Sequence, residues 1–200
     1  IIDVSDRTYF QVAAQGKPFV EEPVISRLDE ELVFVFTVPI YDDNRTVVGV
    51  LLATVKAGVL SNQINDITIG KNGYCCILGT TGNIIAHPDF SFVEQMTNHS
   101  EKAKSDDSLS SIAAFEKMAL ETNQSSVGFY EFKGISKIGS YAVMKTTGWI
   151  VIISAPVEEF MGVVQTLRIT MLGLGILILI LAVVIIYFVT RTIIKPIQRA

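Results

Sequence analysis

The pattern of hydrophobic and polar positions separates one continuous apolar segment from the rest of the chain. Residues 169–189 contain no charged side chain, and no polar face recurs along them as it would on an amphipathic helix. At a rise of 1.5 Å per residue, such a segment is long enough to cross a hydrocarbon layer about 30 Å thick. The pattern therefore predicts one transmembrane helix, with the residues before it on one side of the membrane and the tail on the other.

Before this segment, β-branched and aromatic runs bounded by turn residues alternate with helical spacing. The first part predicts a short helix, an extended piece, two long strands joined by a turn, and a helical connector, at residues 6–15, 19–22, 32–40, 46–56 and 57–67. The pattern then restarts. It predicts two short strands, a polar helical region with a loop inside it, and three more strands, at residues 73–78, 84–87, 88–123, 126–132, 136–144 and 149–156, with the loop at 105–111.

The order of the second group, two strands, helices and then three antiparallel strands, is that of a PAS-like fold. The predicted fold class is therefore α+β, with tandem PAS-like modules of antiparallel sheets and flanking helices, followed by one transmembrane helix. Residues 157–168 predict a helix that continues directly into the span.

Charge indicates the orientation of the span. Arg191, Lys195 and Arg199 follow it, whereas Glu158 and Glu159 precede it. Because an excess of Lys and Arg marks the cytoplasmic flank, we expect a protein of the cell membrane with its N-terminal part outside and its C-terminus inside. The net charge of −4, with an excess of basic over acidic residues only in the tail, argues against nucleic-acid binding.

Few residues suggest chemistry. Adjacent residues of a strand point to opposite faces, so Cys75 and Cys76 are interpreted as small apolar strand residues rather than as a disulfide. His87 and His99 have no partner at a metal-binding spacing, and His87 is expected to be a hydrogen-bonded structural group. We therefore expect no catalytic residues, no metal site and no cofactor.

Four stretches carry a family resemblance when taken in their order along the chain. They read DRTYFQVAAQGK, VPIYDDNRTVVGVLLATV, IGKNGYCCILGTTGNIIAHPD and GWIVIISAP. Together they resemble the extracellular double Cache sensor domain of bacterial transmembrane receptors of the methyl-accepting chemotaxis protein type. The tail TRTIIKPIQRA resembles the start of a HAMP linker, with Pro196 at the position of the family's proline.

The resemblance implies a domain organisation. It places the C-terminal part of a membrane-distal Cache module, a membrane-proximal Cache module, a connecting helix, the transmembrane helix and the start of a HAMP linker at residues 1–57, 58–156, 157–168, 169–189 and 190–200. We also expect the chain to be part of a longer protein, with a membrane helix upstream and a cytoplasmic domain downstream, because it starts without a methionine and stops inside a predicted helix.

The resemblance also implies a ligand site in the distal module. Arg7 aligns with an arginine that holds a ligand carboxylate, and Tyr9 and Phe10 stand beside it. A further tyrosine of the family falls at Val24 or the residue after it, and an aspartate that holds the ligand ammonium aligns with Thr54. Since an unpaired ammonium is costly to bury, we expect a plain carboxylate or another small anion rather than an α-amino acid.

Two alternatives stay open at this point. Arg7 could pair with Asp3 or Asp6 and only fix the start of the helix, and the proximal module could hold a ligand that the sequence does not identify. The function implied is a ligand-gated sensor, in which a small molecule shifts the population of two conformations. Its partners would be the ligand, the membrane, a second copy in a homodimer and cytoplasmic signalling proteins.

The output is expected to be chemotaxis, although the sensor half of a histidine kinase or a diguanylate cyclase would look the same. An ectoenzyme would need a nucleophile–base pair or a metal site, and the sequence shows neither motif. A passive anchored binding protein would not need a linker of the HAMP type.

Overall fold

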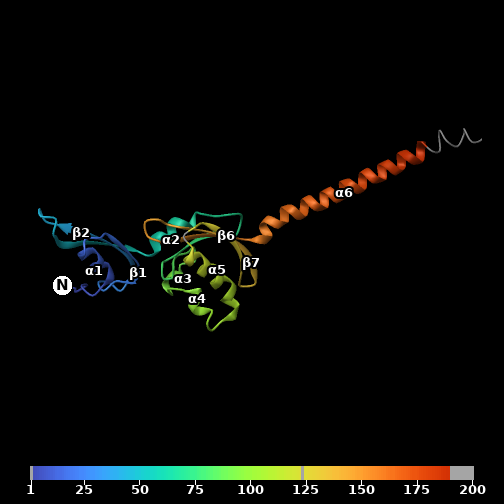
Figure 1. Ribbon diagram of the computed structural model, residues 1–200. Coiled ribbons are helices and arrows are strands. Elements are labelled where there is room, and N and C mark those ends of the chain that lie inside the picture. The colour runs from blue at the N-terminus through green and yellow to red at the C-terminus, as the bar shows by residue number, and fades with distance from the viewer. Residues whose placement is uncertain (1, 123, 190–200) are drawn as a thin grey trace, which may run out of the picture. The chain divides into compact units, whose positions relative to one another are not determined.

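Two antiparallel sheets and their flanking helices make up the chain before residue 157 (Figure 1). The computed structural model describes residues 2–122 and 124–189. The chain divides into two units, one ending at Pro156 and one beginning at Val157. The predicted α+β class, with antiparallel sheets and flanking helices, is confirmed.

The first sheet has three strands in the order β1-β2-β3 and is covered on one face by α1. Its elements are α1 (Thr8–Ala14), β1 (Phe19–Ile25), β2 (Leu32–Tyr41) and β3 (Val47–Lys56). Under α1, the buried side chains of Tyr9, Val33 and Val35 form a small apolar cluster. The alternation of β2 explains this cluster, since every second residue of a strand points to the same face.

The second sheet has five strands in the order β5-β4-β8-β7-β6. Its strands are β4 (Tyr74–Leu78), β5 (Ile84–Ala86), β6 (Ser126–Phe132), β7 (Ile135–Val143) and β8 (Ile150–Pro156). The helices of this part are α2 (Gly58–Asn65), α3 (Ser91–Glu94), α4 (His99–Lys102) and α5 (Ser110–Glu121), with a 3₁₀ turn η1 at Asp107–Leu109. The last strand in the chain, β8, therefore lies in the middle of its sheet.

The predicted order of helices and strands is confirmed. The structure differs from the prediction at residues 105–111 and at the end of β1. The segment predicted as a loop at 105–111 contains η1 and the start of α5. Strand β1 does not stop at residue 22 but continues past a β-bulge, in which Glu22 and Pro23 together oppose Phe34. Proline has no amide hydrogen for the ladder, so a bulge is where a strand accommodates it.

The two sheets share one hydrophobic core, although the predicted boundary between the modules falls between the end of β3 and the start of α2. Phe34 of β2 is 3% exposed and belongs to the same buried cluster as Leu78 and Ile150 of the second sheet. Its ring centroid lies 5.4 Å from that of Trp149. Trp149 therefore lies in the core of the second sheet and also contacts the first.

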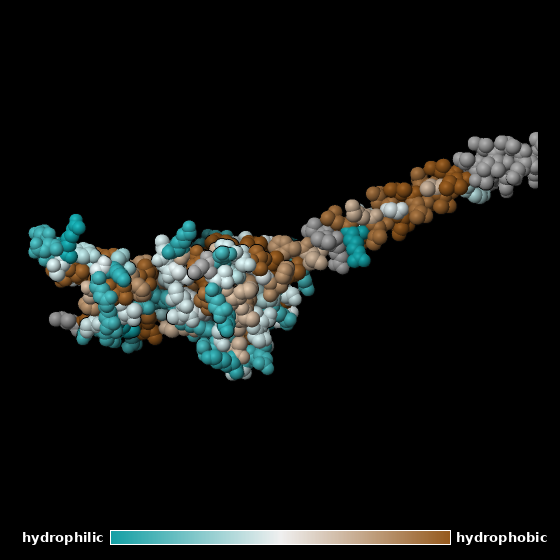
Figure 2. Space-filling view, in the orientation of Figure 1, coloured by the Kyte–Doolittle hydropathy of each residue, from teal (hydrophilic) through white to brown (hydrophobic). Residues whose placement is uncertain are grey.

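Helix α6 (Val157–Val189) follows β8 without a break, as predicted. It contains one candidate membrane span, Leu167–Tyr187, judged by length and composition among the described residues. The sequence placed this span two residues later, at 169–189. Figure 2 shows that the helix surface is hydrophobic over most of its length. The predicted HAMP start at 190–200 lies outside the described residues.

Replacing Phe34 with alanine should lower the free energy of unfolding by about 3 to 5 kcal/mol, because a fully buried ring leaves a cavity in the shared core. Trp149 is the only tryptophan of the chain. Its fluorescence during denaturation in detergent micelles therefore reports on the contact between the sheets. Phe129, 73% exposed on β6, supplies the matched control, and Phe129→Ala should change stability by less than about 0.5 kcal/mol. Equal effects of the two variants would contradict a shared core.

Candidate functional site

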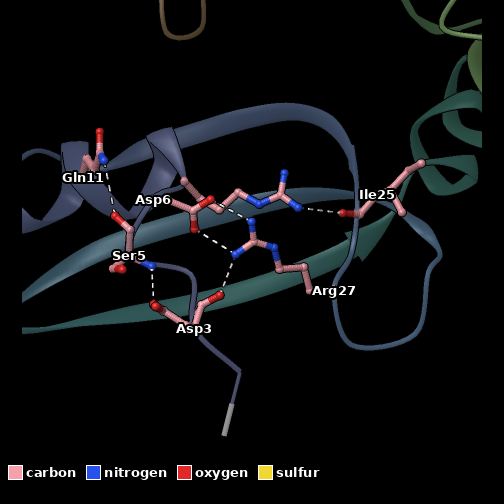
Figure 3. Close-up of polar contacts among 7 residues, drawn as sticks. Asp3, Ser5, Asp6, Gln11, Ile25 and Arg27 are labelled. Atoms are coloured by element: carbon pink, nitrogen blue, oxygen red, sulfur yellow. Dashed lines mark hydrogen bonds and ion pairs between the residues drawn. The ribbon is translucent and has the colours of Figure 1, made fainter.

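Arg7 immediately precedes α1 and has an extended backbone conformation, with φ −79° and ψ 138°. Its Nη2 donates to the backbone carbonyl of Ile25 over a long distance of 3.4 Å (Figure 3). Its Nε is buried and has no hydrogen-bond partner among the residues that the structure describes. Within residues 2–122 and 124–189, it forms no ion pair with a carboxylate. One nitrogen of the guanidinium group, Nε, is therefore left unsatisfied within the described part of the chain.

The alternative in which Arg7 pairs with Asp3 or Asp6 is wrong, because Arg27 takes this place. Arg27 donates to both carboxylate oxygens of Asp6, at 2.7 and 2.8 Å, and to the backbone carbonyl of Asp3 at 2.7 Å (Figure 3). The hydrogen bond from Arg27 lowers the pKa of Asp6 below its usual value. Arg27 rather than Arg7 therefore fixes the segment that leads into α1.

Arg7 lines a cleft of ≈ 420 Å³ between the two sheets. One wall consists of Arg7 and residues 21–25 of β1, and the other consists of residues near the β4–β5 turn, β5 and α3. The volume lies within the range of small-molecule sites in proteins. A second hollow of ≈ 310 Å³, lined by residues such as Phe36 and Thr146, contains no charged side chain in its lining. The first cleft is therefore the better candidate for a polar ligand.

Glu21 and Glu22 are neighbours on β1, but their carboxyl groups have different surroundings. Burial, together with the nearby charge of Glu22, raises the pKa of Glu21, while a hydrogen bond from the Tyr9 amide and the charge of Arg7 lower it by less. The carboxylate of Glu22 instead contacts the β4–β5 turn. It accepts hydrogen bonds from the Thr80 amide, from Thr80 Oγ1 at 2.7 Å and from Thr81 Oγ1 at 2.7 Å.

The structure brings four of the five residues implied by the resemblance into one region. Arg7 and Val24 line the cleft, while Tyr9, Phe10 and Val24 pack in the apolar cluster under α1. Thr54 does not join them, since it lies exposed on β3 and is absent from the lining of the cleft. Whether these residues bind a ligand stays a prediction.

Sequence reasoning did not identify Glu21 as a residue of the cleft. The available signal was a pair of acidic residues inside an otherwise apolar extended segment, followed directly by a proline. Without knowledge of the bulge, however, the direction of neither side chain could be derived.

The interior of the second sheet contains polar residues of a different kind. His99 Nδ1 lies 2.8 Å from Glu116 Oε1, and both residues are buried. The hydroxyl groups of Tyr130 and Ser154 are 2.6 Å apart. The cavity that Glu116, His99 and Tyr130 line has only ≈ 10 Å³, about the room of one water molecule. These side chains therefore satisfy one another in a filled interior.

The histidine and cysteine residues that could take part in catalysis or metal binding have structural roles instead. His87 Nδ1 accepts a hydrogen bond from the Asp89 amide at 2.9 Å, which confirms the prediction of a structural group. Cys75 and Cys76 are buried in β4 with free thiols, which confirms their interpretation as apolar strand residues. Among the residues that the structure describes, no group of three His, Cys, Asp or Glu side chains could hold a metal ion.

Comparison with known proteins places these observations in a family. The family model described as "Cache domain" matches residues 2–164. The methyl-accepting chemotaxis protein McpC of Bacillus subtilis (strain 168) is 22% identical over 199 residues, which cover 98% of this chain and 27% of McpC. The chain thus spans about a quarter of the length of this curated relative.

Solved structures share the fold. The extracellular domain of the histidine kinase mmHK1S-Z3 matches with a TM-score of 0.65 and 16% identity, over 84% of this chain and 60% of that chain. The ligand-binding domain of the Pseudomonas fluorescens chemoreceptor CtaA, in complex with L-leucine, matches with a TM-score of 0.59 and 18% identity, over 79% of this chain and 62% of that chain. The chain therefore spans less than two thirds of either solved domain.

Arg7→Ala should change the melting temperature less than Arg27→Ala, because Arg7 makes one long hydrogen bond whereas Arg27 makes three short ones. The pKa of Asp6 is lower in the folded protein than its value of 3.8 in the unfolded chain, so ionised Asp6 stabilises the fold at pH values above 3.8. This stabilisation is lost as the pH falls through the lowered pKa. The gap between wild type and Arg27→Ala should therefore narrow below pH 3.8 in differential scanning fluorimetry. An equal loss in Arg7→Ala at neutral pH would assign Arg7 a structural role.

Glu116→Gln tests the buried pair of the second sheet. Burial raises the pKa of Glu116 above its ordinary value of 4.5, so the native state binds its proton more tightly than the unfolded state does. The stability of the wild type relative to Glu116→Gln should therefore fall as the pH rises from 4.5 through the raised pKa. Denaturation curves of both proteins across this window measure the difference, and a difference that grows with pH would contradict the assignment.

Proposed function

The chain belongs to the Cache-domain family, and from this premise we propose that it is the extracellular ligand-sensing part of a bacterial transmembrane signalling receptor. A small molecule, preferably one with a carboxylate, binds outside the membrane. The resulting conformational signal passes through α6 to a cytoplasmic output, which we propose to be chemotaxis. The chain itself has no enzymatic role and needs no cofactor in this proposal.

One observation carries the ligand assignment, namely the unpartnered Nε of Arg7 beside a cleft of ≈ 420 Å³. Leaving a buried donor unsatisfied costs about 1 to 3 kcal/mol. A carboxylate would recover this free energy, because a guanidinium group offers it two parallel hydrogen bonds. A related chemoreceptor domain, that of CtaA, was solved in complex with L-leucine, which also has a carboxylate.

The roles of the other residues follow from their positions. Val24 provides apolar surface in the cleft, and Tyr9 and Phe10 pack with Val24 in the cluster under α1. Thr54 has the least support, because it lies exposed on β3.

The route to the membrane follows from the topology. Strand β8 pairs with both β4 and β7 and continues directly into α6. A ligand that binds one conformation of the sheets more tightly shifts the population toward it, and a shift of β8 displaces the start of α6. The proposed orientation, with residues before the span outside the cell and the C-terminus in the cytoplasm, rests on the basic residues after the span. We also propose that the receptor works as a homodimer and that residues 190–200 begin a HAMP linker.

A histidine kinase is a second candidate for the cytoplasmic output, because the extracellular domain of the histidine kinase mmHK1S-Z3 has a TM-score of 0.65 with this chain. The same sensing part would serve a histidine kinase or a diguanylate cyclase. The sequence that follows the proposed HAMP linker in the full-length protein distinguishes these outputs.

Carboxylates should raise the melting temperature of the chain in detergent micelles, measured by Trp149 fluorescence against a panel of carboxylates, amino acids, amines and purines. At a ligand concentration 100 times the Kd, binding to the native state stabilises it by about 2.7 kcal/mol. Arg7→Ala should abolish the shift, because it removes the group that holds the carboxylate.

The matched control is Arg45→Ala, which removes a guanidinium group from the exposed β2–β3 turn. This variant should keep the full shift. A shift that survives in Arg7→Ala, or no shift with any compound of the panel, would contradict the proposed site.

A further inference from the structure

We propose that the second sheet carries an anion site of its own, in which Lys133, Lys137 and His87 hold a small tetrahedral dianion such as phosphate or sulfate. None of these three residues lines the Arg7 cleft. The inference therefore goes beyond the proposed sensing function, and either can fail without the other.

Two lysine side chains lie over one aromatic ring of the second sheet. The Nζ atoms of Lys133 and Lys137 are 5.3 and 5.5 Å from the centroid of the Phe132 ring. Lys133 extends from the exposed turn between β6 and β7, whereas Lys137, on β7, is only 8% exposed. Because both ammonium groups contact the same ring, two like charges are held near each other, one of them largely removed from water.

Neither ammonium group forms an ion pair with a carboxylate in the part of the chain that the structure describes. Lys137 Nζ donates instead to the hydroxyl of Tyr74, at 3.3 Å. The carboxylate of Asp89 accepts hydrogen bonds from the amide and the hydroxyl of Ser91. Burial lowers the pKa of Lys137, since a desolvated ammonium group without a counter-charge is unfavourable.

Three aromatic rings connect the lysines with His87. The centroid of Phe92 lies 5.7 Å from Lys133 Nζ and 4.5 Å from the centroid of His87. The centroid of Tyr74 lies 4.5 Å from Lys137 Nζ and 5.0 Å from the centroid of His87. Basic and aromatic side chains therefore alternate in a closed circle of contacts, whose members are His87, Phe92, Lys133, Phe132, Lys137 and Tyr74.

His87 contributes a hydrogen-bond donor to this circle. Its Nδ1 accepts the hydrogen bond from the Asp89 amide at 2.9 Å. Burial lowers the pKa of His87 and so favours the neutral imidazole, in which the hydrogen then sits on Nε2. Within the described ranges, Nε2 donates to no other residue. It is therefore available to an oxygen of a ligand.

The arrangement fits a tetrahedral dianion better than a carboxylate. Two ammonium charges balance two negative charges, and ammonium groups bind phosphate as point charges, whereas a planar carboxylate suits the fork of an arginine. Donors at separate places on a circle match oxygens that point in different directions. The cavity behind His87, Phe92 and Tyr74 has only ≈ 10 Å³, so the dianion would bind on the outer side, beside Lys133.

The site lies at the end of β8 that leads into α6. Lys137 pairs across the sheet with Pro156, the last residue of β8, and Tyr74 pairs with Ser154. Helix α6 begins at the next residue, Val157. A dianion held by Lys137 would therefore act on the part of β8 next to the membrane helix.

Isothermal titration of the chain in phosphatidylcholine nanodiscs, at constant ionic strength, tests the site with sulfate and phosphate as probes. We expect both to bind at least tenfold more tightly than acetate or chloride. Lys133→Met changes an exposed turn residue and should weaken sulfate binding tenfold or more. The matched control is Lys145→Met, in the exposed β7–β8 turn, which should keep the wild-type affinity within twofold.

The melting temperature without sulfate separates an anion site from lysines that only pack on aromatic rings. Lys137→Met keeps the apolar stem and removes a buried charge that lacks a partner, so it should raise the melting temperature and abolish sulfate binding. If Lys137 served only to stabilise the rings by cation–π contact, the same variant would melt at a lower temperature. That lower temperature would contradict the uncompensated charge on which the inference rests.

Three results of the titration would overturn the anion site and leave the proposed function standing. The first is no binding of sulfate or phosphate to the wild-type chain. The second is equal sulfate affinity in the wild type and in Lys133→Met. The third is sulfate binding that is lost in Arg7→Ala but kept in Lys133→Met, which would place the dianion in the Arg7 cleft.

Discussion

The burial of Phe34 against Trp149 is the contact on which the rest of the structure before α6 depends. It inserts a ring from the first sheet into the core of the second, so that neither sheet can shift without repacking a dense interior. The polar contact from Glu22 to Thr80 and Thr81 is a second point of attachment. Glu22 also lines the cleft in which Arg7 Nε has no hydrogen-bond partner among the described residues.

Buried polar groups have partners in the core of the second sheet, but one of them lacks a partner in the Arg7 cleft. In the second sheet, His99 with Glu116 and Tyr130 with Ser154 satisfy each other around a cavity of about one water molecule. In the cleft, Arg7 is close to a carboxylate but is not paired with it. Buried polar groups normally find partners within the protein, so an exception at an open cleft indicates a place that a ligand completes.

The sequence was sufficient for the elements but not for the contacts between them. The long β-branched runs of β2 and β3, the two short strands of the second module and the uncharged span of α6 all depend on local periodicity, which one sequence displays. Local periodicity does not predict which residue pairs with Asp6. Arg7 and Arg27 carry the same charge, and Arg27 reaches Asp6 only because of the path that β1 takes through the fold. The same holds for Glu21, whose direction depends on a bulge that Pro23 permits but does not specify. The contact of Trp149 with Phe34 could not be predicted either, because it joins segments far apart in sequence.

We propose that occupation of the Arg7 cleft is transmitted through α6. Joining this chain to the cytoplasmic part of a methyl-accepting chemotaxis protein, in cells that lack other receptors, makes kinase activity the readout of that claim. We expect that a compound bound by the isolated chain changes kinase activity in these cells, and that the change disappears in Arg7→Ala but not in Arg45→Ala. No change in kinase activity with a bound compound, or a change that persists in Arg7→Ala, would contradict it.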